Sequence, residues 1–284
     1  MYEATGDDRN IISTLGSKLF NLYAYFELLF PILLIYQFTK KEINKKMVLG
    51  IVILIIGYWL HEVLLGGRSK LVQNLLYTIV VYLIMRPYIN KERNIKIMKY
   101  GTIVISIGLL GMLAVTLSRF VFNSSSTQDN IWSWLSLYAG EGSINFNSSM
   151  WYVTKTTNGN SSFILLMHML GLTDKIGVND QWDAVESLGI QGNIFYTYIG
   201  VFFCDLGKWM TIIYISIASY ITYRLSRCKK HIYLPQIIIL CFCARILCLP
   251  TFYTFGTYMS QINLSVALIF CLLLHLNQKG KILL

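Results

Sequence analysis

Long apolar runs constrain this sequence more than any other feature. Seven of them are long enough to suggest membrane spans, and they cover residues 15–38, 47–65, 71–85, 101–122, 208–223, 234–252 and 262–276. Only 13% of the residues are charged, about half the fraction in a typical soluble domain. The excess apolar side chains must face something other than water, and lipid is the simplest partner. The sequence therefore predicts an all-α integral membrane protein with about seven transmembrane helices.

The basic residues predict the orientation of these spans. Lys and Arg gather in the segments 40–46, 86–99 and 224–230 and in the tail at 279–281, which together hold 15 of the 24 basic residues. These segments alternate along the chain, and an excess of Lys and Arg marks the cytoplasmic side of a membrane. We therefore expect an extracytoplasmic segment at 1–14, spans one to four within 15–122, and spans five to seven with a cytoplasmic tail within 194–284.

The start of the chain leaves two interpretations open. Seven spans place the N-terminus outside, yet the first ten residues are polar and acidic and do not form a signal peptide. One interpretation is that the sequence begins late within a longer protein that has earlier spans. The other is a genuine protein with its N-terminus outside.

The segment 123–193 is predicted to be one large extracytoplasmic loop. It holds two basic and six acidic residues, and loops of this length usually have a function. Within it, residues 163–172 are apolar but too short to span, which indicates an interfacial or re-entrant helix. The next apolar run, 194–206, ends at Gly207 and is either a half-helix that dips back or the start of a long, tilted fifth span.

Charge distribution and cysteine spacing exclude several classes of function. The net charge is +10, but the basic residues flank apolar runs and do not form the continuous basic face of a nucleic-acid-binding protein. Most of the six cysteines lie inside apolar runs, and no CxxC or Cys/His spacing occurs. We therefore expect no nucleic-acid partner, no metal site and no disulfide.

Three arginines map to the predicted outer leaflet and are candidates for binding an anion. Arg68 lies in a glycine-rich turn, Arg119 near the outer end of the fourth span and Arg245 inside the sixth. A guanidinium stays charged and holds phosphate through two parallel hydrogen bonds, so convergence of the three would suit a phosphate-bearing ligand. Alternatively, Arg119 reaches to lipid headgroups and Arg68 is only a turn charge. Arg245 is harder to explain in this way because it is further from a helix end.

Carboxylates and aromatic residues on the same side supply further candidates. Asp205 lies between apolar runs, where it would either pair with an arginine or act as a general base. Glu141 lies in the large loop, which is also rich in Trp, Tyr and Asn. Aromatic rings and amides suit sugar binding, although Trp and Tyr also form the interfacial belt of any membrane protein. The triplets at Asn147 and Asn160 match glycosylation sequons, which occur often by chance.

Three segments, in order along the chain, resemble the oligosaccharide repeat-unit polymerases of bacterial surface polysaccharides, the O-antigen polymerase (Wzy-type) family. The first is Gly66-Gly67-Arg68-Ser69, and the second is Tyr138-Ala139-Gly140-Glu141-Gly142 followed by Asn145-Phe146-Asn147. The third is Gly192-Asn193, leading through Tyr196-Thr197 to Asp205-Leu206-Gly207. The resemblance covers about residues 60–250. The family typically has more spans, so this chain departs from it by lacking the N-terminal part.

The resemblance implies a membrane glycosyltransferase that joins oligosaccharide units carried on undecaprenyl pyrophosphate. Arg68, Arg119 and Arg245 would neutralise the pyrophosphate as the bond to it breaks. Asp205 or Glu141 would deprotonate the acceptor hydroxyl. Sugars would be oriented by three loop residues, Tyr138, Asn145 and Asn193. No cofactor is implied, since the arginines can balance the charge.

The implied setting is the bacterial cytoplasmic (inner) membrane, where a chain-length regulator and a flippase are candidate partners. Two other functions stay open. A transporter or flippase of lipid-linked saccharide would share the arginines and aromatics, but the internal repeats that favour it are not seen. A membrane O-acyltransferase acting on polysaccharide would need a histidine-based site within the spans, and His231 and His275 lie near the cytoplasmic side.

Overall fold

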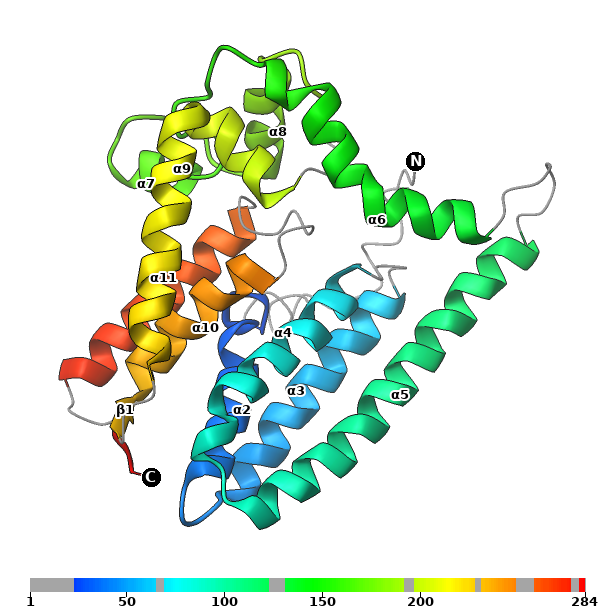
Figure 1. Ribbon diagram of the computed structural model, residues 1–284, viewed down its shortest axis with the longest axis vertical. Coiled ribbons are helices and arrows are strands. Elements are labelled where there is room, and N and C mark those ends of the chain that lie inside the picture. Colours follow the sequence, from blue (N-terminus) through cyan, green and yellow to red (C-terminus); the bar gives the residue numbers. More distant parts are fainter. Residues whose placement is uncertain are drawn as a thin grey trace.

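The computed structural model describes residues 23–64, 69–122, 131–191, 197–227, 231–248, 258–276 and 281–283. This part of the chain is mostly helical, which confirms the predicted all-α class (Figure 1). The elements are α2 (Leu29–Thr39), α3 (Lys45–Leu64), α4 (Ser69–Met85), η2 (Arg86–Tyr88), α5 (Lys91–Phe122), α6 (Ile131–Ser148), η3 (Met150–Tyr152), α7 (Ile164–Met169), α8 (Val178–Glu186), α9 (Tyr198–Ser226), β1 (His231–Tyr233), α10 (Leu234–Cys248), α11 (Tyr258–Leu276) and β2 (Lys281–Leu283).

Two helices among the described residues are long and apolar enough to cross a membrane. They are Ile199–Ser226 within α9 and Tyr258–Leu276, which is α11. Two shorter helical segments, Leu29–Thr39 and Leu234–Arg245, are also apolar. These helices support membrane association, whereas the count of seven spans and the large extracytoplasmic loop stay predictions.

Helix α10 lies at the centre of the helical core. It contacts α2, α4, α9 and α11, and its residues Ile237, Ile238 and Cys241 are almost fully buried. Pro235 stands in its first turn, where a missing N–H costs nothing because the first N–H groups of a helix have no partner within it. The other core helices present apolar side chains to α10, including the buried Ile32 of α2 and Tyr77 of α4.

The predicted cytoplasmic segments meet at one end of the molecule. The Arg93 guanidinium at the start of α5 donates to the Phe38 carbonyl at 3.3 Å and the Lys41 carbonyl at 2.7 Å, and so joins α5 to the turn between α2 and α3. Strand β1 pairs with β2, which brings the segment after α9 against the C-terminal tail. Figure 1 shows these turns and the C-terminus at the end opposite to α7 and α8.

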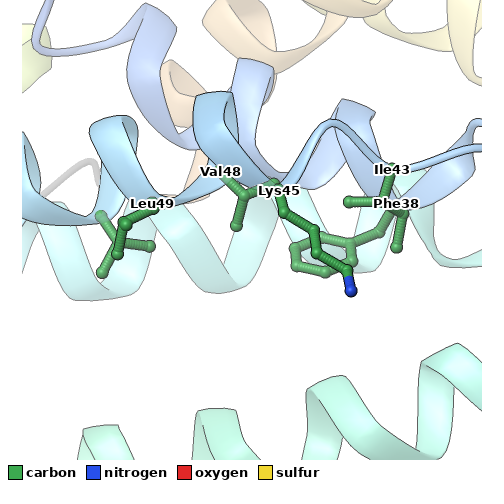
Figure 2. Close-up of a pocket in the computed structure, with 6 residues that line it drawn as sticks. Phe38, Ile43, Lys45, Val48 and Leu49 are labelled. Carbon is green, nitrogen blue, oxygen red and sulfur yellow. The ribbon is translucent and has the colours of Figure 1, made fainter.

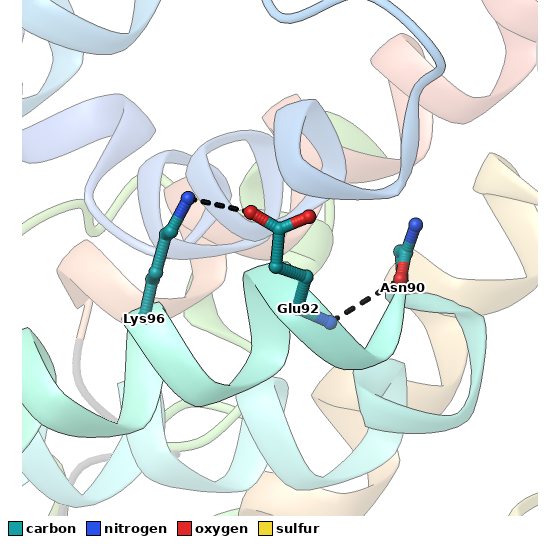
Figure 3. Close-up of polar contacts among 3 residues, drawn as sticks. All are labelled: Asn90, Glu92 and Lys96. Atoms are coloured by element: carbon teal, nitrogen blue, oxygen red, sulfur yellow. Dashed lines mark hydrogen bonds and ion pairs between the residues drawn. The ribbon is translucent and has the colours of Figure 1, made fainter.

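A capped first turn begins α5 at this basic end. Figure 3 shows the Asn90 side chain accepting a hydrogen bond from the Glu92 N–H at 3.2 Å, as an N-cap residue does. Glu92 also pairs with Lys96 one turn later, at 2.8 Å. The hydrogen bond and positive charge of Lys96 lower the pKa of Glu92, but exposed pairs of this kind contribute little to stability.

At the opposite end, α6, η3, α7 and α8 form a cap over the start of α9 (Figure 1). A short helix, α7, occurs where the sequence predicts one at 163–172, but it spans only six residues. Leu166, Met169, Leu170 and Leu172 on or beside α7 are more than half exposed. An exposed apolar surface fits an interfacial helix, and its depth in a membrane stays a prediction.

Helix α9 is broken at Gly207, where φ is +74° and ψ is 175°. This backbone conformation is accessible to glycine and strained for other residues. The break divides α9 into a short limb, 198–206, and a long limb that begins at Lys208. The helix begins at Thr197, whose side chain accepts from the Gly200 N–H at 3.1 Å. The short limb, in which the run 194–206 ends, therefore points in a different direction from the long limb.

Candidate functional site

A cavity of about 240 Å³ lies among α7, α9, α10 and α11. Most of its wall is apolar and comes from residues such as Phe202, Leu264 and Leu268, while Arg245 of α10 and Ser162, just before α7, supply polar groups. Leu166 and Met169 of α7 line it opposite α11, and Leu264 and Leu268 of α11 are partly exposed on the outer surface. An apolar pocket with a few convergent polar groups is the usual form of a small-molecule site.

Arg245 is the strongest candidate among the residues predicted from the sequence. Its side chain is 4% exposed, and its guanidinium lies over the Tyr77 ring of α4, 5.6 Å from the ring centroid. Tyr77 presents the electron-rich face of its ring to the cation. Glu27, near the start of α2, also acts electrostatically on the guanidinium. Arginine stays protonated in proteins, so α10 carries a buried positive charge to the wall of the cavity.

Asp205 holds a turn formed by residues 157–162. The carboxylate is 1% exposed, and its Oδ1 accepts from the Gly159 N–H at 3.0 Å, from the Ser161 N–H at 3.2 Å and from the Thr157 hydroxyl. Its Oδ2 accepts from the Ser162 N–H at 2.9 Å. Four donors on one carboxylate stabilise its charge and fix the turn.

Two glutamines hold the same turn from the other side. The Gln181 side chain of α8 donates to the Ser161 carbonyl at 2.6 Å, and the Gln261 side chain of α11 donates to it at 3.1 Å. Gln261 also accepts from the Leu165 N–H at 2.9 Å, and Gln181 accepts from the Tyr258 N–H at 2.8 Å. The turn therefore connects α7, α8, α9 and α11 through buried and partly buried hydrogen bonds.

This geometry favours a structural role for Asp205 over the role of general base. A base must be reached by the proton of the substrate, whereas Asp205 is 1% exposed and its oxygens accept hydrogen bonds from the turn. Four donors from residues 157–162 contact the carboxylate, so within the described residues Asp205 pairs with the turn. The role of Asp205 as base stays an untested prediction.

The other predicted site residues are placed less completely. Glu141 and Asn145 lie one turn apart on α6, and each is partly buried. The next residue, Phe146, contacts Phe203 at 5.7 Å between ring centroids, so α6 packs against the short limb of α9 that carries Asp205. The structure therefore places the end of α6 against the short limb of α9.

Four predicted site residues lie partly or wholly outside the described part of the structure. Arg68 and Asn193 are outside the described residues. Arg119 lies in α5 and Tyr138 in α6, but the positions of their side chains are outside the described part. The convergence of three arginines therefore stays a prediction, and among the described side chains only Arg245 of the three is placed in the cavity.

Three residues of the site were not predicted from the sequence. Gln181 and Gln261 stand singly in their helices, and Ser162 was noted only as part of the sequon triplet at Asn160. Nothing in the local pattern marks them, because their partners are 20 to 100 positions away along the chain. The one feature of the sequence that could have indicated this turn is the excess of hydrogen-bonding residues in 154–162.

A second hollow, of about 360 Å³, lies at the basic end between α2 and α3. Figure 2 shows Phe38, Ile43, Val48 and Leu49 along it, with the Lys45 side chain extending beside the Phe38 ring. Its wall is apolar except for Lys45, and none of the predicted site residues contributes to it. We therefore assign the candidate functional site to the cavity that contains Arg245.

No family model, curated protein or solved structure matches the chain significantly. In the described part of the chain, no group of three or more His, Cys, Asp or Glu residues is arranged to hold a metal ion. Functional assignment therefore depends on the cavity and on the motifs that resemble the polymerase family.

Proposed function

We propose that this chain is a membrane glycosyltransferase that polymerises undecaprenyl-pyrophosphate-linked oligosaccharide units at the outer face of the bacterial cytoplasmic membrane. The observation that carries the proposal is the buried charge of Arg245 in the wall of an otherwise largely apolar cavity. An isoprenoid pyrophosphate has the same two properties, an apolar chain and an anionic head. Its phosphate would meet the guanidinium that Glu27 and the Tyr77 ring already face, and its chain would contact the apolar wall.

Leaving-group stabilisation is the step in which Arg245 would act. Negative charge grows on the pyrophosphate as the glycosidic bond to it breaks, and a fixed guanidinium in a site without water stabilises that charge strongly. Arg68 and Arg119 would add to this charge if they reach the same anion. Glu141 on α6 would serve as base for the acceptor hydroxyl, with Tyr138, Asn145 and Asn193 orienting the sugars.

The proposal includes the seven-span topology. The basic turns would be cytoplasmic, and α6, α7 and α8 would lie outside, above the cavity. Two features of the fold support this arrangement: the basic turns meet at one end, and the cap of α6 to α8 lies at the other (Figure 1). A flippase would supply the lipid-linked units from the cytoplasmic side, and a chain-length regulator would act on the growing polymer.

Substitution of Arg245 tests the proposed function. In the source bacterium with its own gene replaced, Arg245→Ala should abolish long polymer, because an alanine cannot balance the pyrophosphate charge. Arg245→Lys should retain part of the activity, because lysine keeps the charge but loses the bidentate geometry. Polymer length is measured on a gel beside the amount of protein in the membrane.

Arg227→Ala is the matched control. Arg227 is an exposed arginine just after α9, at the basic end, where it stacks on Tyr223. This variant should make polymer of normal length. Full-length polymer from Arg245→Ala at a normal protein level would refute the proposed role of Arg245.

A further inference from the structure

The hollow of about 360 Å³ between α2 and α3 combines an apolar wall with one charged group. Five apolar side chains line it, and Lys45, in the first turn of α3, is the one charged residue among the described residues that do so. Lys45 is exposed, and its side chain extends beside the Phe38 ring (Figure 2). Leu49, one turn later in α3, is 61% exposed. The hollow is therefore open to a ligand both at its charged end and along its wall.

The apolar wall continues along one face of α3. Lys45 begins a stripe of residues spaced three or four positions apart, which continues with Leu49, Val52 and Ile56. From Lys45 to Ile56 the helix rises roughly 16 Å, at about 1.5 Å per residue. One leaflet of a typical bilayer has a hydrocarbon layer about 15 Å thick. A charge followed by an apolar stripe of this length matches the headgroup and acyl chain of one lipid in one leaflet.

The charges around the hollow are mostly positive. Residues 40–46 hold four lysines and one carboxylate, Glu42. The Arg93 guanidinium adds a further positive charge, because it binds main-chain carbonyls of this turn, which carry no formal charge. Lys45 forms no ion pair with a described residue, and the first turn of α3 contains no acidic residue to balance the positive end of the helix dipole. An anion at Lys45 would therefore be stabilised by the whole turn.

We propose that this hollow is a binding site for an anionic phospholipid of the surrounding membrane, with its phosphate at Lys45 and an acyl chain along Leu49 and Val52. Basic pockets between transmembrane helices on the cytoplasmic side are suited to such headgroups. A zwitterionic phospholipid fits the same wall, but its headgroup has no net charge for the lysines to balance. The hollow shares no lining residue with the Arg245 cavity, so this proposal is independent of the polymerase function.

The test is titration of the purified chain in detergent with phosphatidylglycerol and with phosphatidylcholine of the same acyl chains, measured by native mass spectrometry. The unchanged chain should bind phosphatidylglycerol more tightly, and equal binding of the two lipids would overturn the proposal. Lys45→Gln should weaken phosphatidylglycerol binding roughly fivefold, the effect of one lysine near an anionic surface, and should leave phosphatidylcholine binding unchanged. Lys45→Arg keeps the charge and should bind as the unchanged chain does.

Lys46→Gln is the matched control. It removes the same charge one position later, but Lys46 lies about 100° further round the helix and does not line the hollow. Its effect on phosphatidylglycerol binding should be smaller than that of Lys45→Gln. Equal weakening by the two variants would show a general attraction of the lipid to the basic end and would overturn the site in the hollow.

Substitution in the wall separates a lipid from other occupants. Leu49→Asn should weaken the binding of both lipids, because both acyl chains contact the same wall. Glycerol 3-phosphate, which has no acyl chain, should not displace phosphatidylglycerol at equal concentration. Displacement would show a site for a soluble anion. Loss of a dimer in Leu49→Asn with unchanged lipid binding would show that a second copy covers this face, and either result would overturn the proposal.

Discussion

At the residue scale, the carboxylate of Asp205 anchors a turn that lies more than 40 positions earlier in the chain. It accepts hydrogen bonds from three main-chain N–H groups and from Thr157, all within residues 157–162. A carboxylate used in this way fixes the turn, and at 1% exposure it has almost no surface open to a substrate. The same residue also stands two positions before the break at Gly207, so it joins the turn to the bend in α9.

Asp205→Asn tests which role dominates. The amide retains one oxygen but places an NH₂ group against a main-chain N–H, so at least one buried donor loses its acceptor. We expect destabilisation of about 2–3 kcal/mol. A clearly lower unfolding temperature in detergent would show this, and Glu141→Gln, at a partly buried position on α6, is the comparison that should unfold normally. If Asp205→Asn unfolds normally but makes no polymer, Asp205 acts as the general base instead.

At the element scale, the bend in α9 sets the position of the cavity. The short limb carries Phe202 and the long limb carries Tyr214, and both residues line the cavity. Their rings stack with centroids 4.5 Å apart across the bend. A straight helix would keep its long limb in line with 198–206 and would change the contact between these two rings.

Gly207→Ala should therefore disturb both the fold and the site. The backbone conformation at Gly207 is strained for alanine, and the added Cβ would lie 3.3 Å from the Thr156 Cγ2. We expect a loss of about 1–3 kcal/mol in stability and less long polymer. Gly101→Ala is the control, since its Cβ in α5 meets nothing within 4 Å. An unchanged unfolding temperature for Gly207→Ala would contradict the required bend.

Sequence periodicity located these elements but not their contacts. A short helix follows residue 163, as the apolar run indicates, and a break occurs at Gly207, where the sequence left a half-helix and a tilted fifth span open. By contrast, the turn at 157–162 depends on Asp205, which is more than 40 positions away. Spacing within a helix reports which residues share a face, not which distant loop packs there, so the anchoring of Asp205 could not be predicted.

At the whole-molecule scale, the two opposite ends of the fold carry different charged residues. One end joins the basic turns through Arg93 and through the pairing of β1 with β2. The other end holds the cap of α6 to α8, which contains the acidic residues Asp180 and Asp183 of α8. Helices α9 and α11 connect the two ends and are apolar enough to cross a membrane. This polarity is what a protein with basic residues on the cytoplasmic side requires.

Cysteine labelling of intact cells tests this orientation. Lys45→Cys at the start of α3 and Lys175→Cys before α8 both replace exposed lysines, at opposite ends of the fold. An impermeant thiol reagent should label Lys175→Cys from outside and should reach Lys45→Cys only after the cells are opened, because we expect the basic turn that contains Lys45 to be cytoplasmic. The unchanged chain controls for its own cysteines, of which Cys204, Cys241 and Cys271 are buried. Labelling of Lys45→Cys in intact cells would show that the topology is the inverse of the one expected. The Arg245 cavity would then lie nearer the cytoplasmic face, and polymerisation at the outer surface would lose its basis.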